Sequence, residues 1–265
     1  MGGIIAMSFT KKERYRVLPG PEGLLPPAAA LMGILQPKEG EGLLEGEALP
    51  EEQVMEVIAE KMLTRRNPTL FPGPLLIWGW NQQTREKAAA VLKMAKEIPG
   101  ARIITMPDYR PIYPKINPEV VFSPCHPNLT LWHNHIEVCM LIDAHCHFVN
   151  VTLKMIRAGT SCYTITLCAN DTHEDSVASI GPCDIETIRK LTKTIIRVRD
   201  SGKVTPWAYT EEGKAEIRDC PNKSMFVHLQ EGGLPVASSN GTGDGEETGP
   251  AFSHDLERGL DENEE

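Results

Sequence analysis

Short, mainly apolar runs alternate with longer amphipathic segments along residues 51–200. The expected strands span residues 74–79, 102–106, 136–142 and 162–168. The expected helices span residues 51–66, 84–98, 151–158 and a last segment that begins after Asp184, a good N-cap residue. Because strands that are apolar on both faces must be covered on both faces, this alternation predicts a parallel sheet between two helical layers. We therefore expect a three-layer, Rossmann-like α/β domain over residues 51–200.

The segments on either side of this domain have a different character. Residues 1–50 are rich in Pro and Gly and show no sustained period, which predicts an irregular N-terminal extension. Residues 201–237 contain apolar runs at 204–209 and 225–229, which we expect to add edge strands. Residues 238–265 are rich in Gly, Glu and Asp, and this composition predicts a disordered acidic C-terminal tail.

The charge of the chain argues against two classes of partner. The formal net charge of −9 lies mostly in residues 241–265, which hold nine acidic residues and one Arg. The remainder is close to neutral, so we expect binding neither to nucleic acid nor to a membrane surface. No apolar run is long enough to span a membrane, and no secretory signal is present. We therefore expect a soluble, cytoplasmic protein whose seven cysteines are thiols or ligands rather than a disulfide framework.

Polar residues follow each expected strand, at the edge where parallel sheets bind ligands. The candidate cofactor-binding residues at this edge are Gly79, Asn81, Asp108, Tyr109, His145, His147, Asn170 and Asp171. Neither G-x-G-x-x-G after a strand nor a P-loop occurs, so a nucleotide would be held without the usual fingerprint. Helix caps and turns are the alternative interpretation of the same loops.

Histidine and cysteine are concentrated in residues 125–173, which hold six of the eight His and five of the seven Cys. Three of these cysteines fall in or beside expected strands and are predicted to pack in the core: Cys139, Cys162 and Cys168. His145 and His147 flank Cys146 at a strand end, where alternation would direct both imidazoles to one side. These three residues are the candidate metal or redox set, with a polar binding loop as the preferred interpretation. His173 is a candidate acid or base, but no catalytic motif assigns it a role, and the catalytic residues stay unknown.

Several stretches resemble a known family. The chain is similar to the carbon monoxide dehydrogenase beta subunit family, whose member in the archaeal acetyl-CoA decarbonylase/synthase complex is called epsilon. It also resembles the central, nucleotide-binding-like domain of thiamine-diphosphate enzymes. The resemblance covers about residues 51–200 and is carried by the sequences at 61–68 (KMLTRRNP), 71–79 (FPGPLLIWG), 88–95 (AAAVLKMA), 107–111 (PDYRP), 126–129 (HPNL) and 133–139 (HNHIEVC).

The resemblance implies an accessory, non-catalytic subunit of an anaerobic one-carbon complex rather than its nickel-containing subunit. It implies an iron–sulfur-containing catalytic partner, from a one-carbon or 2-oxoacid complex, and FAD or another nucleotide at the strand ends, with a proposed role in electron transfer. Two alternatives remain open. One is a metal-dependent enzyme or redox protein that uses the His145, Cys146 and His147 loop. The other is a purely structural interaction subunit.

Overall fold

The computed structural model describes residues 37–77, 79, 81–106, 122, 126–168, 172–173, 175–221 and 223–227. Seven strands form one sheet in the order β2-β1-β7-β6-β5-β3-β4. Their bounds are β1 Glu41–Leu44, β2 Glu47–Pro50, β3 Thr69–Pro72, β4 Arg102–Ile103, β5 Val138–Ile142, β6 Tyr163–Leu167 and β7 Ala178–Ile180. Strands β3 to β7 are parallel to one another, whereas β1 pairs antiparallel with both β7 and β2.

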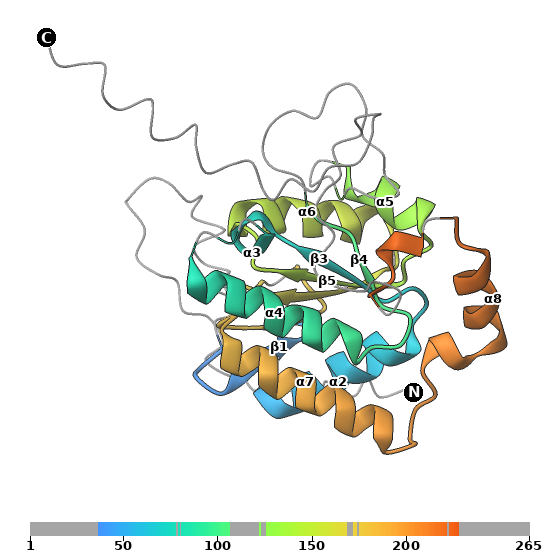
Figure 1. Cartoon of the computed structure of the whole chain (residues 1–265). Helices are drawn as coiled ribbons and strands as arrows, with labels where there is room; N and C mark the ends of the chain where they lie inside the picture. The colour runs from blue at the N-terminus through green and yellow to red at the C-terminus, as the bar shows by residue number, and fades with distance from the viewer. Residues whose placement is uncertain are drawn as a thin grey trace, which may run out of the picture. The chain divides into compact units, whose positions relative to one another are not determined.

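Helices cover both faces of the sheet (Figure 1). One layer holds α2 (Glu51–Thr64), α4 (Gln82–Lys96) and α7 (Ile185–Asp200). The opposite layer holds α5 (Pro127–His133) and α6 (Cys146–Gly159). The remaining helical elements are α3 (Pro74–Ile77), η1 (Trp207–Tyr209), α8 (Glu211–Asp219) and η2 (Lys223–Met225).

Strand β5 shows why the sheet needs two covering layers. Val138, Met140 and Ile142 pack into the core beneath α2, α4 and α7. Cys139 and Leu141, which alternate with them, pack into the core beneath α5 and α6. All five residues are buried, so both faces of this strand are covered. The predicted three-layer, Rossmann-like α/β fold is therefore confirmed.

The parallel strands have the flavodoxin-like order. Numbered by their succession along the chain, β4, β3, β5, β6 and β7 read 2-1-3-4-5 across the sheet. The next strand along the chain after β3, β4, lies on one side of β3, and the strand after that, β5, lies on the other side. In sheets of this order, ligands bind outside the carboxyl ends of the strands at the point where the direction changes. This topology puts the expected ligand site beside the ends of β3 and β5.

The long helices agree with the sequence pattern. α2 and α4 begin and end within two residues of their predicted bounds. The Asp184 side chain caps α7 as expected, because it accepts a hydrogen bond from the Thr187 N–H at 2.7 Å. α6 begins at Cys146, five residues before the expected start, so the loop between β5 and α6 is short.

The strand predicted at residues 74–79 is wrong. The strand is Thr69–Pro72, which pairs with both β4 and β5, and Pro74–Ile77 forms the short helix α3. Proline suits the first turn of a helix because its missing N–H needs no partner there. An apolar run this short carries no period that could separate the two structures.

Three further expectations at the flanks need correction. Residues 41–50, predicted as part of an irregular extension, form the β1–β2 hairpin, and Glu45 and Gly46 make its turn with φ of 51° and 80°. Within the run at 204–209, Trp207–Tyr209 is a 3₁₀ helix rather than a strand. The run at 225–229 was expected to form an edge strand, and its described residues make one isolated antiparallel bridge, between Phe226 and Arg102. The acidic tail at 238–265 lies outside the described residues.

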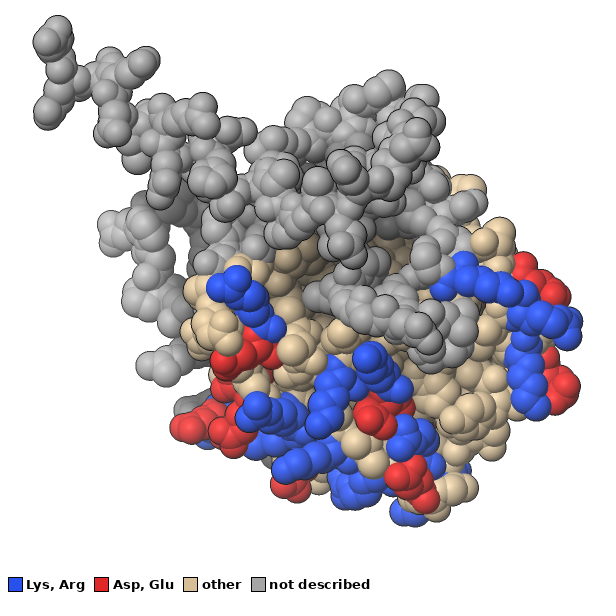
Figure 2. All heavy atoms as spheres, in the orientation of Figure 1, with Lys and Arg blue, Asp and Glu red and all other residues tan. Residues whose placement is uncertain are grey.

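Surface charges of both signs interleave over α4 and α7 (Figure 2). Arg197 pairs with Glu56 of α2 at 2.9 Å, and Arg199 pairs with Glu97 at 2.8 Å. The first pair is exposed and the second is half-buried, and surface pairs of this kind contribute little to stability, about 0–1 kcal/mol each. They nevertheless give this face a mixed charge. None of the helices in the described part of the chain is long and apolar enough to cross a membrane.

Candidate binding site at the carboxyl edge of the sheet

The loops that follow β3 and β5 touch one another at the point where the strand connections change direction. The Gly73 N–H donates a hydrogen bond to the Ile142 carbonyl at 2.8 Å. A Cβ atom at Gly73 would lie 2.5 Å from Ala144 Cα and 2.6 Å from the Asp143 carbonyl oxygen. Only glycine allows the two backbones to approach so closely. This contact joins the two loops at the candidate site.

Two helix N-termini lie at this edge. Asn81 caps α4 by accepting a hydrogen bond from the Thr84 N–H at 2.8 Å, and Gly79 precedes it with φ of 56°. His145 occupies the cap position of α6 without a side-chain capping bond. Neither helix has an acidic residue in its first turn. Unneutralised helix N-termini attract anions, phosphate groups in particular.

An ion pair joins α4 to the end of β5. The Lys87 ammonium lies 2.8 Å from Asp143 Oδ2, with side chains that are 16% and 4% exposed. Asp143 adopts φ of 53°, and its N–H donates to the Leu167 carbonyl. Its second oxygen, Oδ1, is buried and has no hydrogen-bond partner among the described residues. A buried acceptor without a partner is costly, so Oδ1 is a candidate acceptor for a ligand donor.

Two cysteines near the sheet are chemically inert thiols. Burial raises the pKa of Cys183 to about 12, and the Asp143 carboxylate adds to this shift. The hydrogen bond with Cys162, together with burial, holds the pKa of Cys139 well above its ordinary range. Thiols rather than thiolates at neutral pH are poor nucleophiles. The expectation that Cys139 packs in the core is confirmed, since it is 0% exposed.

The cysteine that begins α6 lies beside residues from two other segments. Cys146 Sγ is 3.2 Å from Cys168 Sγ, at the end of β6. A ligand atom of each of Cys146, Cys168 and His173 lies within 4.8 Å of the others. His173 Nδ1 is 2.7 Å from Asn150 Oδ1 of α6. Cys168 is buried as expected, but it is also part of this cluster.

The histidines on either side of Cys146 do not join it in a ligand set. His145 and His147 have ring centroids 5.8 Å apart, and neither belongs to the three-residue cluster found among the described residues. The two rings therefore lie close to one another. Because α6 already begins at Cys146, strand alternation does not account for their position.

The other candidate residues divide into two groups. Gly79 and Asn81 lie directly before α4, and His145 and His147 lie at the start of α6, so the structure brings four candidates to the carboxyl edge. The remaining four lie outside the described residues: Asp108, Tyr109, Asn170 and Asp171. Three residues of this edge were not predicted from the sequence: Gly73, Lys87 and Asp143. Asp143 could have been found as the first polar residue after a buried strand, but the partner on α4 had no local signal.

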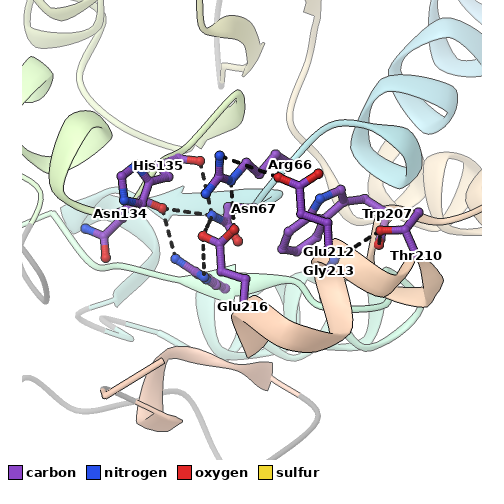
Figure 3. A network of polar contacts seen from close by, with 10 residues as sticks. Arg66, Asn67, Asn134, His135, Trp207, Thr210, Glu212, Gly213 and Glu216 are labelled. Carbon is purple, nitrogen blue, oxygen red and sulfur yellow. Dashed lines mark hydrogen bonds and ion pairs between the residues drawn. The ribbon is translucent and has the colours of Figure 1, made fainter. Parts of the chain in front are cut away.

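A second polar cluster lies at the amino ends of the strands (Figure 3). Buried Asn67 donates to the carbonyls of Asn134 and His135 and, at 2.5 Å, to Glu216 Oε1 of α8. Glu216 also accepts from Arg66 Nε at 2.7 Å and lies 3.9 Å from Arg102. Burial lowers the pKa of Arg102, and the neighbouring Cys220 and Glu216 oppose that shift.

A hollow of ≈ 240 Å³ borders this amino-edge cluster, lined by residues that include Arg102, Asn134 and Glu216. These polar groups already bond one another across β3, β4 and α8. The cluster therefore holds α8 against the sheet. Because the polar groups of this cluster are already paired with one another, the carboxyl edge is the better candidate for ligand binding.

Comparison with protein-family models gives a match over most of the described domain. The family model described as CO dehydrogenase beta subunit/acetyl-CoA synthase epsilon subunit matches residues 34–195, which include β1 to β7 and all but the last turn of α7. No curated protein matches the chain.

Proposed function

Since this chain belongs to the CO dehydrogenase beta subunit/acetyl-CoA synthase epsilon subunit family, we propose that it is the accessory, non-nickel subunit of such a complex. In this proposal it binds an iron–sulfur-containing catalytic subunit of an anaerobic one-carbon complex. It also holds a flavin or another nucleotide at the carboxyl edge of the sheet. The family membership supports the role as a subunit. The strand order supports the location of the ligand.

The chemistry of the carboxyl edge supports a phosphate-containing ligand. The first turns of α4 and α6 present backbone N–H groups and no carboxylate. Arg85 follows in α4, and its side chain lies 3.4 Å from where a Cβ of Gly79 would be. Asp143 Oδ1 supplies a buried acceptor at the same edge. A nucleotide combines phosphate anions with hydroxyl or amine donors, so it matches both features.

Replacing Asn81 with Asp is expected to weaken nucleotide binding about tenfold, or about 1.4 kcal/mol. Aspartate caps a helix as well as asparagine does, so α4 and the stability of the protein should be retained. The added carboxylate repels phosphate at the same N-terminus. Isothermal titration calorimetry of the reduced full chain with FAD and with ADP measures the change in affinity.

Thr210→Asp is the matched control, because Thr210 caps α8 and the change adds the same charge. It should leave the affinity unchanged. Equal weakening in both variants would point to net charge alone. Absence of FAD and ADP binding in the unsubstituted protein would refute the nucleotide part of the proposal.

Exposed apolar side chains indicate which face of the protein binds the catalytic subunit. Leu129, Trp132, Val151 and Met155 lie on α5 and α6, and they are four of the five large hydrophobic residues exposed in the described part of the chain. The two helices are joined by a hydrogen bond from Asn128 to the Met155 carbonyl. Apolar side chains gathered on one face are typical of protein interfaces, and Trp is the residue type most often at their energetic centre.

Trp132→Glu should reduce capture of the iron–sulfur subunit by about 30-fold, since a central Trp typically contributes about 2 kcal/mol. Anaerobic purification of the tagged chain with its co-expressed catalytic partner measures this, with iron content as the readout. Tyr209→Glu is the control, because Tyr209 is 55% exposed and Trp132 is 59% exposed. Tyr209 lies in η1 rather than in α5 or α6. Retention of the partner by Trp132→Glu would place the interface elsewhere, and failure of the unsubstituted chain to retain it would refute the subunit role.

A further inference from the structure

We propose that Cys146, Cys168 and His173 form a binding site for a single zinc ion. The three residues come from the start of α6, the end of β6 and the segment before β7. Thiolate sulfur and imidazole nitrogen are ligands that zinc prefers, and three protein ligands leave one position of a tetrahedron for another group. The site adjoins the proposed nucleotide site at the N-terminus of α6, but the inference does not depend on nucleotide binding.

The spacing of the ligand atoms suits a zinc ion after a small adjustment. The three atoms lie within 4.8 Å of one another, and the two sulfurs are 3.2 Å apart. With Zn–S bonds of about 2.3 Å, a tetrahedral ion holds its sulfur ligands about 3.8 Å apart. The sulfurs must therefore separate by about half an ångström, a change that rotation of the partly exposed Cys146 side chain can supply.

His173 is oriented as a metal-binding histidine. Its backbone N–H donates to Ser179 Oγ at 3.0 Å, and Nδ1 lies 2.7 Å from Asn150 Oδ1. An amide oxygen only accepts, so Nδ1 carries the proton and Nε2 keeps its lone pair. The residue is 3% exposed, and Nε2 is buried without a hydrogen-bond partner among the described residues. A second ring nitrogen fixed by a polar partner is the usual arrangement of metal-binding histidines.

Electrostatics favour a divalent ion at this point. Cys146 is the first residue of α6, where the positive end of the helix dipole stabilises the negative charge of a thiolate ligand. Two thiolates and one Zn²⁺ sum to zero charge, which suits a site where Cys168 is 2% exposed. A disulfide between the same sulfurs would leave His173 Nε2 buried and unsatisfied. The position of His173 therefore favours a metal ion over a disulfide.

Zinc content of the full chain tests the site. The protein is purified under reducing conditions, stripped with a chelator, reloaded with Zn²⁺ and measured by elemental analysis. We expect one zinc per chain. Co²⁺ in its place should give a thiolate-to-metal charge-transfer band in the near ultraviolet. Cys146→Ser and His173→Gln should remove the band and the stoichiometric zinc.

Two controls separate the site from general thiol chemistry. Cys162→Ser changes a partly buried cysteine outside the cluster, and His147→Gln changes a histidine next to Cys146. Both should retain full zinc binding. Asn150→Ala tests the orientation of His173 without removing a ligand, and we expect about 10–100-fold weaker zinc binding while circular dichroism stays unchanged.

Two results would overturn the proposal. One is a reduced, reloaded protein without zinc or a cobalt charge-transfer band. The other is equal zinc in the unsubstituted chain and in correctly folded Cys146→Ser and His173→Gln variants.

Discussion

Replacing Gly73 with alanine should destabilise the protein by about 3 kcal/mol or more, within the range of severe core substitutions. The new Cβ would lie 2.5 Å from Ala144 Cα and 2.6 Å from the Asp143 carbonyl oxygen. These are backbone atoms, so no side-chain rotation relieves the overlap. The strands β3 and β5 would have to separate, and the 2.8 Å hydrogen bond from Gly73 to Ile142 would be lost. Urea unfolding monitored by circular dichroism measures the change.

Gly40→Ala is the control for the loss of glycine itself. Gly40 has φ of 80°, and a Cβ there would meet nothing within 4 Å. The substitution should cost only the backbone strain of the left-handed region, about 1–2 kcal/mol. Because Gly73 joins the two loops at the candidate site, its alanine variant should also lose affinity for FAD. The Gly40→Ala variant should keep that affinity. Equal destabilisation by the two changes would show that the contact between the loops is not tight.

The sequence predicted those elements whose side-chain pattern is set locally. Strands β5 and β6 are short runs rich in apolar and β-branched residues, and α2, α4 and α7 have long apolar stripes, so each pattern fits one kind of element. The run at 74–79 fits two kinds of element, because four apolar residues can form a strand or one helical turn. The β1–β2 hairpin was missed for another reason. Its place in the sheet depends on pairing with β7, more than 130 residues away along the chain.

The candidate site was predictable only as an edge of the sheet. Chain order and strand ends brought Asn81 and His145 to that edge. The contacts that give it chemistry are tertiary. Lys87 meets Asp143 across 56 residues, and Cys146 meets Cys168 across 22. Such pairs follow from strand order and helix rotation, which a single sequence does not specify. His145 and His147 do have neighbouring rings, but the strand period used to predict this does not extend into α6, which begins at Cys146.

Replacing Glu216 with alanine should destabilise the protein by about 3 kcal/mol, as is typical when one partner of a buried ion pair is removed. Glu216 accepts from Arg66 and Asn67 and lies 3.9 Å from Arg102, whose side chain is 3% exposed (Figure 3). Without the carboxylate, the Arg102 charge stays buried beside β3 and α8 loses its anchor. Thermal and urea unfolding measure the loss.

Glu212→Ala provides the comparison on the same helix. Glu212 is 69% exposed and lies 3.8 Å from Arg66, so its removal should change stability by less than about 0.5 kcal/mol. A double variant identifies the cause. If the cost comes from the stranded Arg102 charge, adding Arg102→Met to Glu216→Ala should cost much less than Arg102→Met costs alone. Additive losses would mean that Glu216 acts through Asn67 and Arg66, and that the charge of Arg102 is balanced elsewhere.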